Sequence, residues 1–232
     1  MTKAPATRIF LVRHGATELT AEDRFAGDID VKLSDAGRQQ ARRLGLRLAP
    51  EPIAAAYASP RSRTQETARL ILGPRELALA TEDALREISH GRWEGETRAD
   101  VEKRYPEEYA RWEADPYTSS PEGGETGLAV TARALPLLLK IVESHPGETV
   151  LVVSHKATIR LLISSLLGFD PRTYRDRLDQ SPASLNVLDF KGPLKARLTL
   201  FNDVSHYADS PSSTPDAPAA RLSKWWDAPP GR

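Results

Sequence analysis

Four short segments carry side chains that could bind and transfer a phosphoryl group. The segments are LVRHGAT, SPRSRTQETA, LREISHGRWEG and VLVVSHKATIR, and the side chains are Arg13, His14, Arg63, Glu87 and His155. A planar guanidinium binds two phosphate oxygens at once, so Arg13 and Arg63 are expected to neutralise the group. His155 adds a further donor to the same anion, and phosphoryl transfer depends mainly on such positioning and charge neutralisation.

His14 and Glu87 are expected to carry out the chemical steps. His14 would attack phosphorus in line, for which its ring must be neutral and its other nitrogen held by a backbone carbonyl. Glu87 would protonate the departing oxygen and then activate the water that cleaves the phosphohistidine. An ordinary glutamate titrates near ~4.3, so this role predicts a pKa raised by partial burial beside phosphate oxygens. Backbone amides at the helix start after His155 are expected to add donors to the phosphate.

Alternating strand and helix patterns predict the elements that position these side chains. Strand-like apolar runs cover residues 8–12, 53–58, 150–153, 185–190 and 197–201. Helical patterns cover residues 34–48, 60–72, 126–143 and 157–167, with Ser34 as an N-cap and Pro50 ending the first run. The unbroken apolar runs IFLV and VLVV are typical of central strands covered on both faces. The sequence therefore predicts an α/β, three-layer sandwich with a central, mostly parallel sheet flanked by helices.

Composition limits the classes of protein to which the chain could belong. The chain has 232 residues, no cysteine, and 32 Lys and Arg balanced by 32 Asp and Glu. Because the charges balance, no net electrostatic field attracts the chain to nucleic acid or anionic membranes. The absence of cysteine excludes thiolate chemistry. No apolar run approaches the roughly 20 residues of a membrane span. We expect a cytoplasmic enzyme with a catalytic domain over residues 1–207 and a Pro/Ser/Ala-rich tail over residues 208–232.

The four segments, taken in order, resemble those of the histidine phosphatase, or phosphoglycerate mutase-like, family. The resemblance runs from about Arg8 to His206, and although RHG alone is a weak signal, all four segments together are a strong one. It implies that His14 is the nucleophile, that Glu87 is the acid and base, and that the two arginines and His155 form the phosphate pocket. It also implies a mostly parallel sheet between helices, no metal and no cofactor.

Several positions depart from the family pattern and bear on the reaction. Many members carry Glu two residues and Asn six residues after the nucleophile, where this chain has Ala16 and Thr20, and Lys156 stands where Gly often follows the second histidine. The first two changes weaken the resemblance to mutases, so a metal-independent phosphomonoesterase is favoured. A bisphosphoglycerate-dependent phosphoglycerate mutase and a non-catalytic phosphate-binding module are the alternatives. The intact nucleophile and acid argue against the module.

Substrate selectivity is expected from residues around this catalytic set. The candidates for contact with a small phosphorylated metabolite are Thr20, Ala26, Gly27, His90, Lys156 and His206. His90 and His206 resemble two histidines of metal-independent bacterial phosphoserine phosphatases, although His90 is also placed to cap a turn. Trp93 and Trp112 are expected to pack in the interior. The sequence does not identify the substrate, and phosphoserine, sugar phosphates and phosphoglycerate derivatives all stay open. It does not identify the oligomeric state either, for which a homodimer is one option.

Overall fold

Six strands form one central sheet in the computed structural model, which describes residues 6–18, 24–27 and 29–208. The strand order is β3-β2-β4-β1-β5-β6, and all pairs are parallel except β1 with β5 and β5 with β6. The bounds are β1 Thr7–Arg13, β2 Ile53–Ala58, β3 Leu79–Thr81, β4 Thr149–Ser154, β5 Leu185–Phe190 and β6 Ala196–Asp203. This mostly parallel sheet confirms the predicted fold class.

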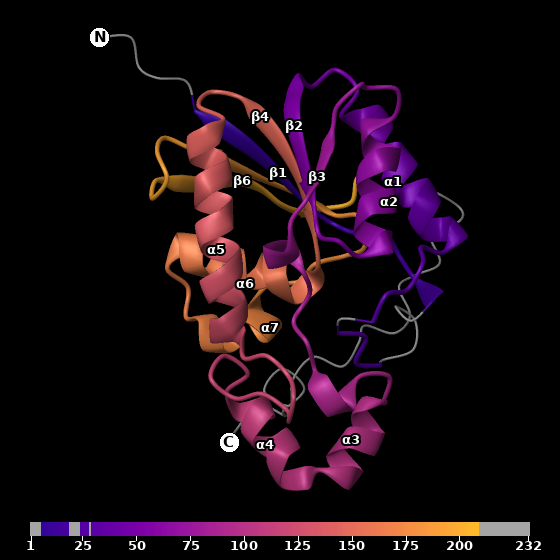
Figure 1. The fold of residues 1–232 in the computed structure, drawn as a ribbon, viewed down its shortest axis with the longest axis vertical. Helices are drawn as coiled ribbons and strands as arrows, with labels where there is room; N and C mark the ends of the chain where they lie inside the picture. The colour runs from indigo at the N-terminus through magenta and orange to yellow at the C-terminus, as the bar shows by residue number, and fades with distance from the viewer. Residues whose placement is uncertain (1–5, 19–23, 28, 209–232) are drawn as a thin grey trace.

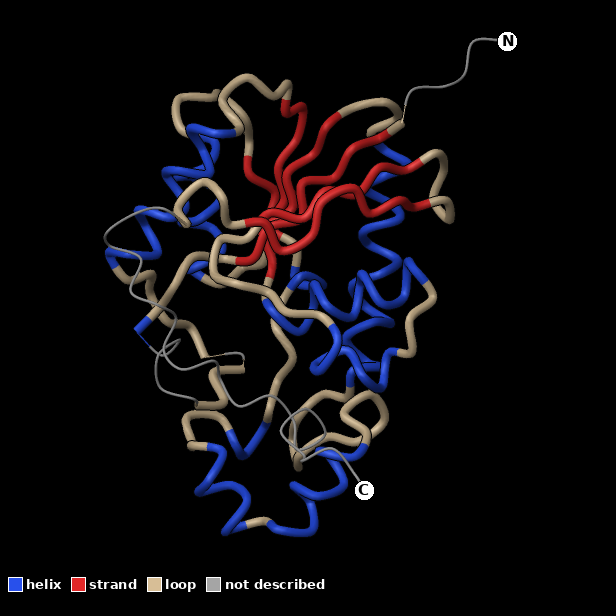
Figure 2. The backbone as a smooth tube through the Cα atoms, turned by 180° about the vertical axis from the view of Figure 1, so that it is seen from behind, coloured by secondary structure: helices blue, strands red, loops and turns tan. Residues whose placement is uncertain are grey.

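Two pairs of long helices cover the two faces of the sheet, as Figures 1 and 2 show from opposite sides. One face carries α1 (Asp35–Arg47) and α2 (Ser62–Leu72), and the other carries α5 (Gly127–Ser144) and α6 (Lys156–Leu167). Ile9 and Leu11 of β1 pack on the α5 and α6 side, whereas Phe10 and Val12 pack on the α1 and α2 side. A central strand buried on both faces must be apolar at every position, which explains the runs IFLV and VLVV.

The remaining short elements build a smaller layer beyond the sheet (Figure 1). It contains α3 (Arg98–Arg104) and α4 (Pro106–Ala114), while α7 (Tyr174–Arg177) lies beside α6. Single 3-10 turns span Asp83–Leu85, Gly91–Trp93 and Pro171–Thr173. Phe25, Trp93 and Trp112 form the centre of an aromatic cluster under α3 and α4. Both tryptophans are fully buried, which confirms their predicted packing role.

Most of the predicted elements match the structure to within two residues at either end. Ser34 is the N-cap of α1, and its hydroxyl accepts a hydrogen bond from the Gly37 amide, as expected of that residue type. The strand β3, the helices α3, α4 and α7 and the three 3-10 turns were not predicted. β3 has only three residues, and α3 and α4 contain few apolar residues because they cover a small cluster rather than the sheet. The predicted tail, residues 208–232, lies outside the described residues apart from Ala208.

Candidate active site

The carboxyl ends of three adjacent strands bring the predicted residues to one edge of the sheet. Arg13 ends β1, Ser59 follows β2 and His155 follows β4, and these strands lie in the order β2-β4-β1. The amide of His14 donates to the carbonyl of Ser154, which extends the ladder one residue beyond β1. The rings of His14 and His155 meet edge to face, with centroids 5.2 Å apart and planes at 64°. The structure therefore brings the two histidines, 141 positions apart in the sequence, into contact.

His14 is held in the geometry that an attacking imidazole needs. Its Nδ1 lies 2.8 Å from the carbonyl oxygen of Gly15, so the proton sits on Nδ1 and the Nε2 lone pair faces away from that carbonyl. Burial, with the charges of Arg63 and Arg13, holds the pKa of His14 well below its usual range and keeps the ring neutral. Gly15 permits this turn, because a Cβ there would lie 2.5 Å from the carbonyl oxygen of Gly37.

Both candidate phosphate-binding arginines are buried and oriented by backbone carbonyls. Arg13 donates to the carbonyl of Gln180, and Arg63 donates to the carbonyls of Gly27 and Ile29. Their exposed fractions are 8% and 3%. These bonds hold the two planar guanidinium groups in fixed orientations. The bond to Gly27 also places the predicted residues Ala26 and Gly27 in the turn that packs against Arg63.

His155 is fully buried and is paired on one side only. Its Nε2 lies 2.8 Å from the hydroxyl of Ser59, and that hydroxyl accepts a 3.4 Å contact from the Arg61 amide. A hydroxyl that accepts from this amide still has its own proton to donate to Nε2, and in that arrangement the ring proton of His155 is on Nδ1. This Nδ1 has no partner within the described part of the chain. Burial, followed by the charge of Arg63, lowers the pKa of His155 well below its usual value, so the ring is a neutral donor.

Glu87 lies against the first turn of α6, beside His155. Its carboxylate accepts hydrogen bonds from the amides of Ala157 and Thr158, both 3.2 Å away, and from the Ile88 amide at 3.0 Å. We expected the amides after His155 to bind the phosphate, and this prediction was wrong for these two, because they are directed at Glu87. The same contacts place the Glu87 carboxylate next to the phosphate pocket, at the N-terminal end of the helix that His155 caps.

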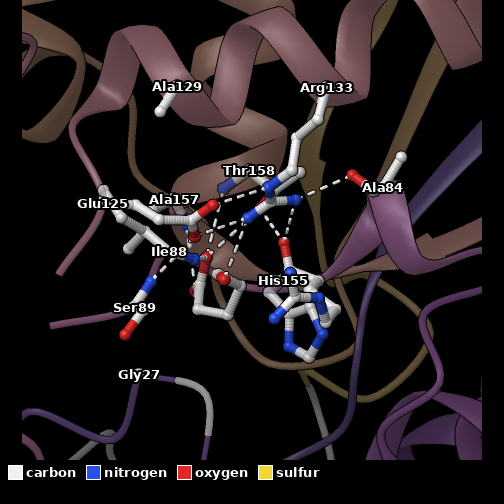
Figure 3. Close-up of polar contacts among 12 residues, drawn as sticks. Gly27, Ala84, Ile88, Ser89, Glu125, Ala129, Arg133, His155, Ala157 and Thr158 are labelled. Atoms are coloured by element: carbon white, nitrogen blue, oxygen red, sulfur yellow. Dashed lines mark hydrogen bonds and ion pairs between the residues drawn. The ribbon is translucent and has the colours of Figure 1, made fainter. Parts of the chain in front are cut away.

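Arg133, on α5, holds the segment that carries Glu87, as Figure 3 shows. Its guanidinium donates to the carbonyls of residues 84, 86 and 87, at 2.8, 3.0 and 3.1 Å, and to both oxygens of Glu125 at 2.9 Å. Glu125 in turn accepts the Ser89 amide at 3.1 Å. Burial would raise the pKa of Glu125, but the hydrogen bonds and charge of Arg133 outweigh it and lower that pKa. Arg133 was not predicted from the sequence.

The remaining selectivity candidates fall in different surroundings. Thr20 lies outside the described residues. His90 packs edge-on against Phe25 and Trp112, and burial, followed by Arg98 and Arg175, lowers its pKa to about 3. His206 packs against Tyr207, and burial lowers its pKa to about 4. Both rings are therefore neutral near pH 7. No contact joins either ring to His14, so their role in binding stays a prediction.

Neither a metal-binding cluster nor a membrane-spanning helix occurs among the described residues. No group of three or more histidines and carboxylates there is arranged to hold a metal ion. No helix among the same residues combines the length and apolar character that crossing a membrane requires.

The strand order and the placement of functional groups at one sheet edge define a phosphoglycerate mutase-like α/β sandwich. The model of the histidine phosphatase superfamily (branch 1) matches residues 9–204, and the chain belongs to this superfamily. Phosphoserine phosphatase 1 of Hydrogenobacter thermophilus is 36% identical over 163 residues, which are 70% of this chain and 77% of that protein.

Solved structures agree with this assignment. Bacillus stearothermophilus YhfR superposes with a TM-score of 0.81 at 33% identity, covering 87% of this chain and 99% of that one. A mycobacterial glucosyl-3-phosphoglycerate phosphatase in complex with VO3 gives a TM-score of 0.74 at 28% identity, covering 84% of this chain and 98% of that one. The chain is a hydrolase of phosphate monoesters.

Proposed function

We propose that the protein hydrolyses a small phosphorylated metabolite through a phosphohistidine formed on His14. The observation that carries this proposal is the state of His14: buried, neutral, with Nδ1 held by the Gly15 carbonyl and two buried arginines beside it. A histidine in a purely structural position has no need of two buried cations next to a neutral ring. Two such cations beside a neutral imidazole suit an anion with several oxygens.

In the first step, Nε2 of His14 forms a bond to phosphorus as the ester P–O bond breaks. The electron pair of that bond leaves with the alkoxide, and Glu87 supplies the proton that makes it an alcohol. Arg13, Arg63 and the Nδ1–H of His155 bind the phosphoryl oxygens and stabilise the charge that spreads over them. The acid role requires Glu87 to hold a proton when the ester is bound.

In the second step, water attacks phosphorus and Glu87 takes one of its protons. The N–P bond breaks, its electron pair returns to Nε2, and inorganic phosphate leaves. His14 is then neutral again and Glu87 again holds a proton. No redox partner or metal enters this balance.

Hydrolysis is favoured over phosphoryl return to a second oxygen by the loop after His14. Two residues beyond the nucleophile stands Ala16, whose backbone bonds to Gln40 and Ser34 and whose methyl group offers no polar contact to a phosphoglycerate. We infer a phosphatase whose substrate belongs to the small phosphorylated metabolites. The 36% identity to a phosphoserine phosphatase makes phosphoserine the first candidate to test.

The experiment compares the wild type with His14→Ala on a panel of phosphorylated metabolites, measuring released phosphate. We expect release by the wild type, no release by the variant, and an acid-labile phosphoryl label on the wild type alone. His145→Ala is the matched control, because His145 bonds to Glu148 and Tyr57 just before β4, at the opposite edge of the sheet. Comparable turnover by folded His14→Ala would contradict the nucleophile assignment. Conversion of 3-phosphoglycerate to 2-phosphoglycerate in place of phosphate release would indicate a mutase.

A further inference from the structure

Two basic side chains on α6 converge on one exposed carboxylate beside the candidate phosphate pocket. Lys156 and Arg160 are one helical turn apart, and Lys156 directly follows His155. The Arg160 guanidinium lies 3.2 Å and the Lys156 ammonium 3.9 Å from the same oxygen of Asp179. The Arg160 side chain is only 7% exposed, and its Nε has no partner in the described part of the chain. Neither basic group is needed for the steps proposed above.

The charges in this cluster do not balance. Lys156 and Arg160 share the carboxylate of Asp179. Its Oδ1, which faces both cations, also accepts a hydrogen bond from the Gln180 amide. Arg13 and Arg98 add further positive potential, and burial, followed by Arg160 and Arg13, lowers the pKa of Lys156 to about 7 against the attraction of Asp179. Lysine as the first residue of a helix is also disfavoured by the helix dipole. Glu87 also acts on Arg160 when it is ionised, but in the acid form that the proposed first step requires it carries no charge. In that state the cluster is short of one negative charge, and helix stability does not explain its lysine.

The position of Glu87 indicates which part of a substrate would meet these groups. Glu87 is bound to the amides of the first turn of α6, the turn that Lys156 begins. The group that protonates the leaving oxygen lies next to that oxygen, so the leaving alcohol must approach this turn. Arg13, by contrast, binds the phosphoryl group in the proposed mechanism.

We infer that Lys156 and Arg160 form a subsite for a carboxylate on the leaving alcohol of the phosphomonoester. A singly charged carboxylate matches the missing charge better than a second, dianionic phosphate, because Asp179 already neutralises one of the two cations. The 3.9 Å separation leaves the Lys156 ammonium free to turn from Asp179 to this ligand. The inference rests on the proposed hydrolysis at His14 and assigns the selectivity of that same site.

The test uses two pairs of substrates that differ mainly by the carboxylate: O-phosphoserine with phosphoethanolamine, and 3-phosphoglycerate with glycerol 3-phosphate. The measurement is the ratio of kcat/KM within each pair. We expect the wild type to favour the carboxylate member, and Lys156→Met to lower that ratio about 10-fold or more, as loss of a charge-assisted hydrogen bond predicts. Lys156→Arg should restore most of the preference. Lys140→Met, on the exposed side of α5, is the control expected to keep the wild-type ratio.

The pH dependence gives a second readout. Lys156 loses its proton as the pH rises through about 7, so the wild-type ratio should fall between pH 6 and pH 8. Lys156→Arg should show no such fall. Equal ratios in the wild type and Lys156→Met, with both substrates of a pair hydrolysed, would overturn the subsite and leave the hydrolase proposal standing. If none of the four is hydrolysed while another phosphomonoester is, the subsite is wrong and the hydrolase proposal stands. If no phosphomonoester of the panel yields phosphate or a phosphohistidine, the proposed function is overturned, and the subsite with it.

Discussion

Arg133 binds both carboxylate oxygens of Glu125 and, with its remaining donors, the backbone of the segment that leads into Glu87. The side chains of Arg133 and Glu125 are 17% and 24% exposed, so this pair is screened only in part from water. An arginine that donates to three carbonyls fixes a segment whose only regular structure is the single 3-10 turn Asp83–Leu85. The pair therefore holds in place the segment that carries the candidate acid.

Replacing Arg133 with Met should misplace Glu87 and lower kcat by about 10²-fold, because small displacements of a catalytic group cost that much. The loss should be larger for alkyl phosphates than for p-nitrophenyl phosphate, since only the former need a proton on the leaving oxygen. Arg133→Lys should recover little of the lost kcat, because a lysine ammonium cannot make the five hydrogen bonds of the Arg133 guanidinium. Arg42→Met, on the exposed face of α1, is the control. A uniform loss for all leaving groups would show that Arg133 only stabilises the fold.

Stability should depend on pH through the buried histidines, of which His90 gives the clearest test. His90 titrates at about 3 in the folded protein and near ~6.5 when unfolded, so the unfolded state binds more protons between these values. Stability from this residue is complete above pH ~6.5 and is lost as the pH falls below it. Between pH 7 and pH 5 the loss amounts to up to about 2 kcal/mol.

The variant His90→Phe removes this titration and keeps a ring against Phe25 and Trp112. Urea unfolding of the variant should therefore show a smaller drop in unfolding free energy from pH 7 to pH 5 than the wild type shows. An unchanged drop would mean that His90 gains a proton without unfolding the protein.

The sequence predicted the residues at the ends of strands, because the signals there are local. An apolar run such as IFLV locates β1, and the residues that follow it must lie at the sheet edge, which brought Arg13 and His14 to the correct place. The same argument placed His155 after β4. The contact between the two rings follows from both strands being parallel neighbours.

The partners of these residues could not be read from the sequence, because they come from distant elements. Nothing in SPRSRTQETA indicates that the Ser59 hydroxyl lies against the ring of a histidine 96 positions later. Arg133 lies on an amphipathic helix where its sequence neighbours give no sign of a special role. Its contacts with the carbonyls of the Glu87 segment are seen only in the folded structure. The prediction that the amides after His155 bind phosphate was wrong for Ala157 and Thr158: an anion does lie at this helix start, but it is the Glu87 carboxylate of this chain.

Activity should survive chelators. In the proposed mechanism Arg13 and Arg63 neutralise the phosphoryl group and His155 donates a hydrogen bond to it, and carboxylate clusters that suit magnesium are absent from the described residues. Phosphate release measured after dialysis against EDTA should match that of untreated enzyme. Loss of activity that a divalent ion restores would contradict this mechanism.

The last prediction concerns Glu87→Gln. Glutamine keeps an oxygen that accepts from the Thr158 and Ile88 amides but places an NH2 group against the Ala157 amide, so the loop should stay folded. If Glu87 protonates the leaving oxygen, the variant should lose most with alkyl phosphates and least with p-nitrophenyl phosphate, whose anion departs without help. General acid catalysis typically contributes ~10²–10⁴-fold, so the difference should be easy to measure.

Glu87 must also assist water in the second step, and this gives the variant a distinct kinetic signature. With p-nitrophenyl phosphate the first step stays fast while hydrolysis of the phosphohistidine becomes slow. We therefore expect a burst of nitrophenol, equal in amount to the enzyme, followed by slow turnover and an acid-labile phosphoryl label on His14. If Glu87 only holds the loop against α6, both kinds of substrate should lose activity equally and no burst should appear. Equal losses in folded Glu87→Gln would assign the acid to another group.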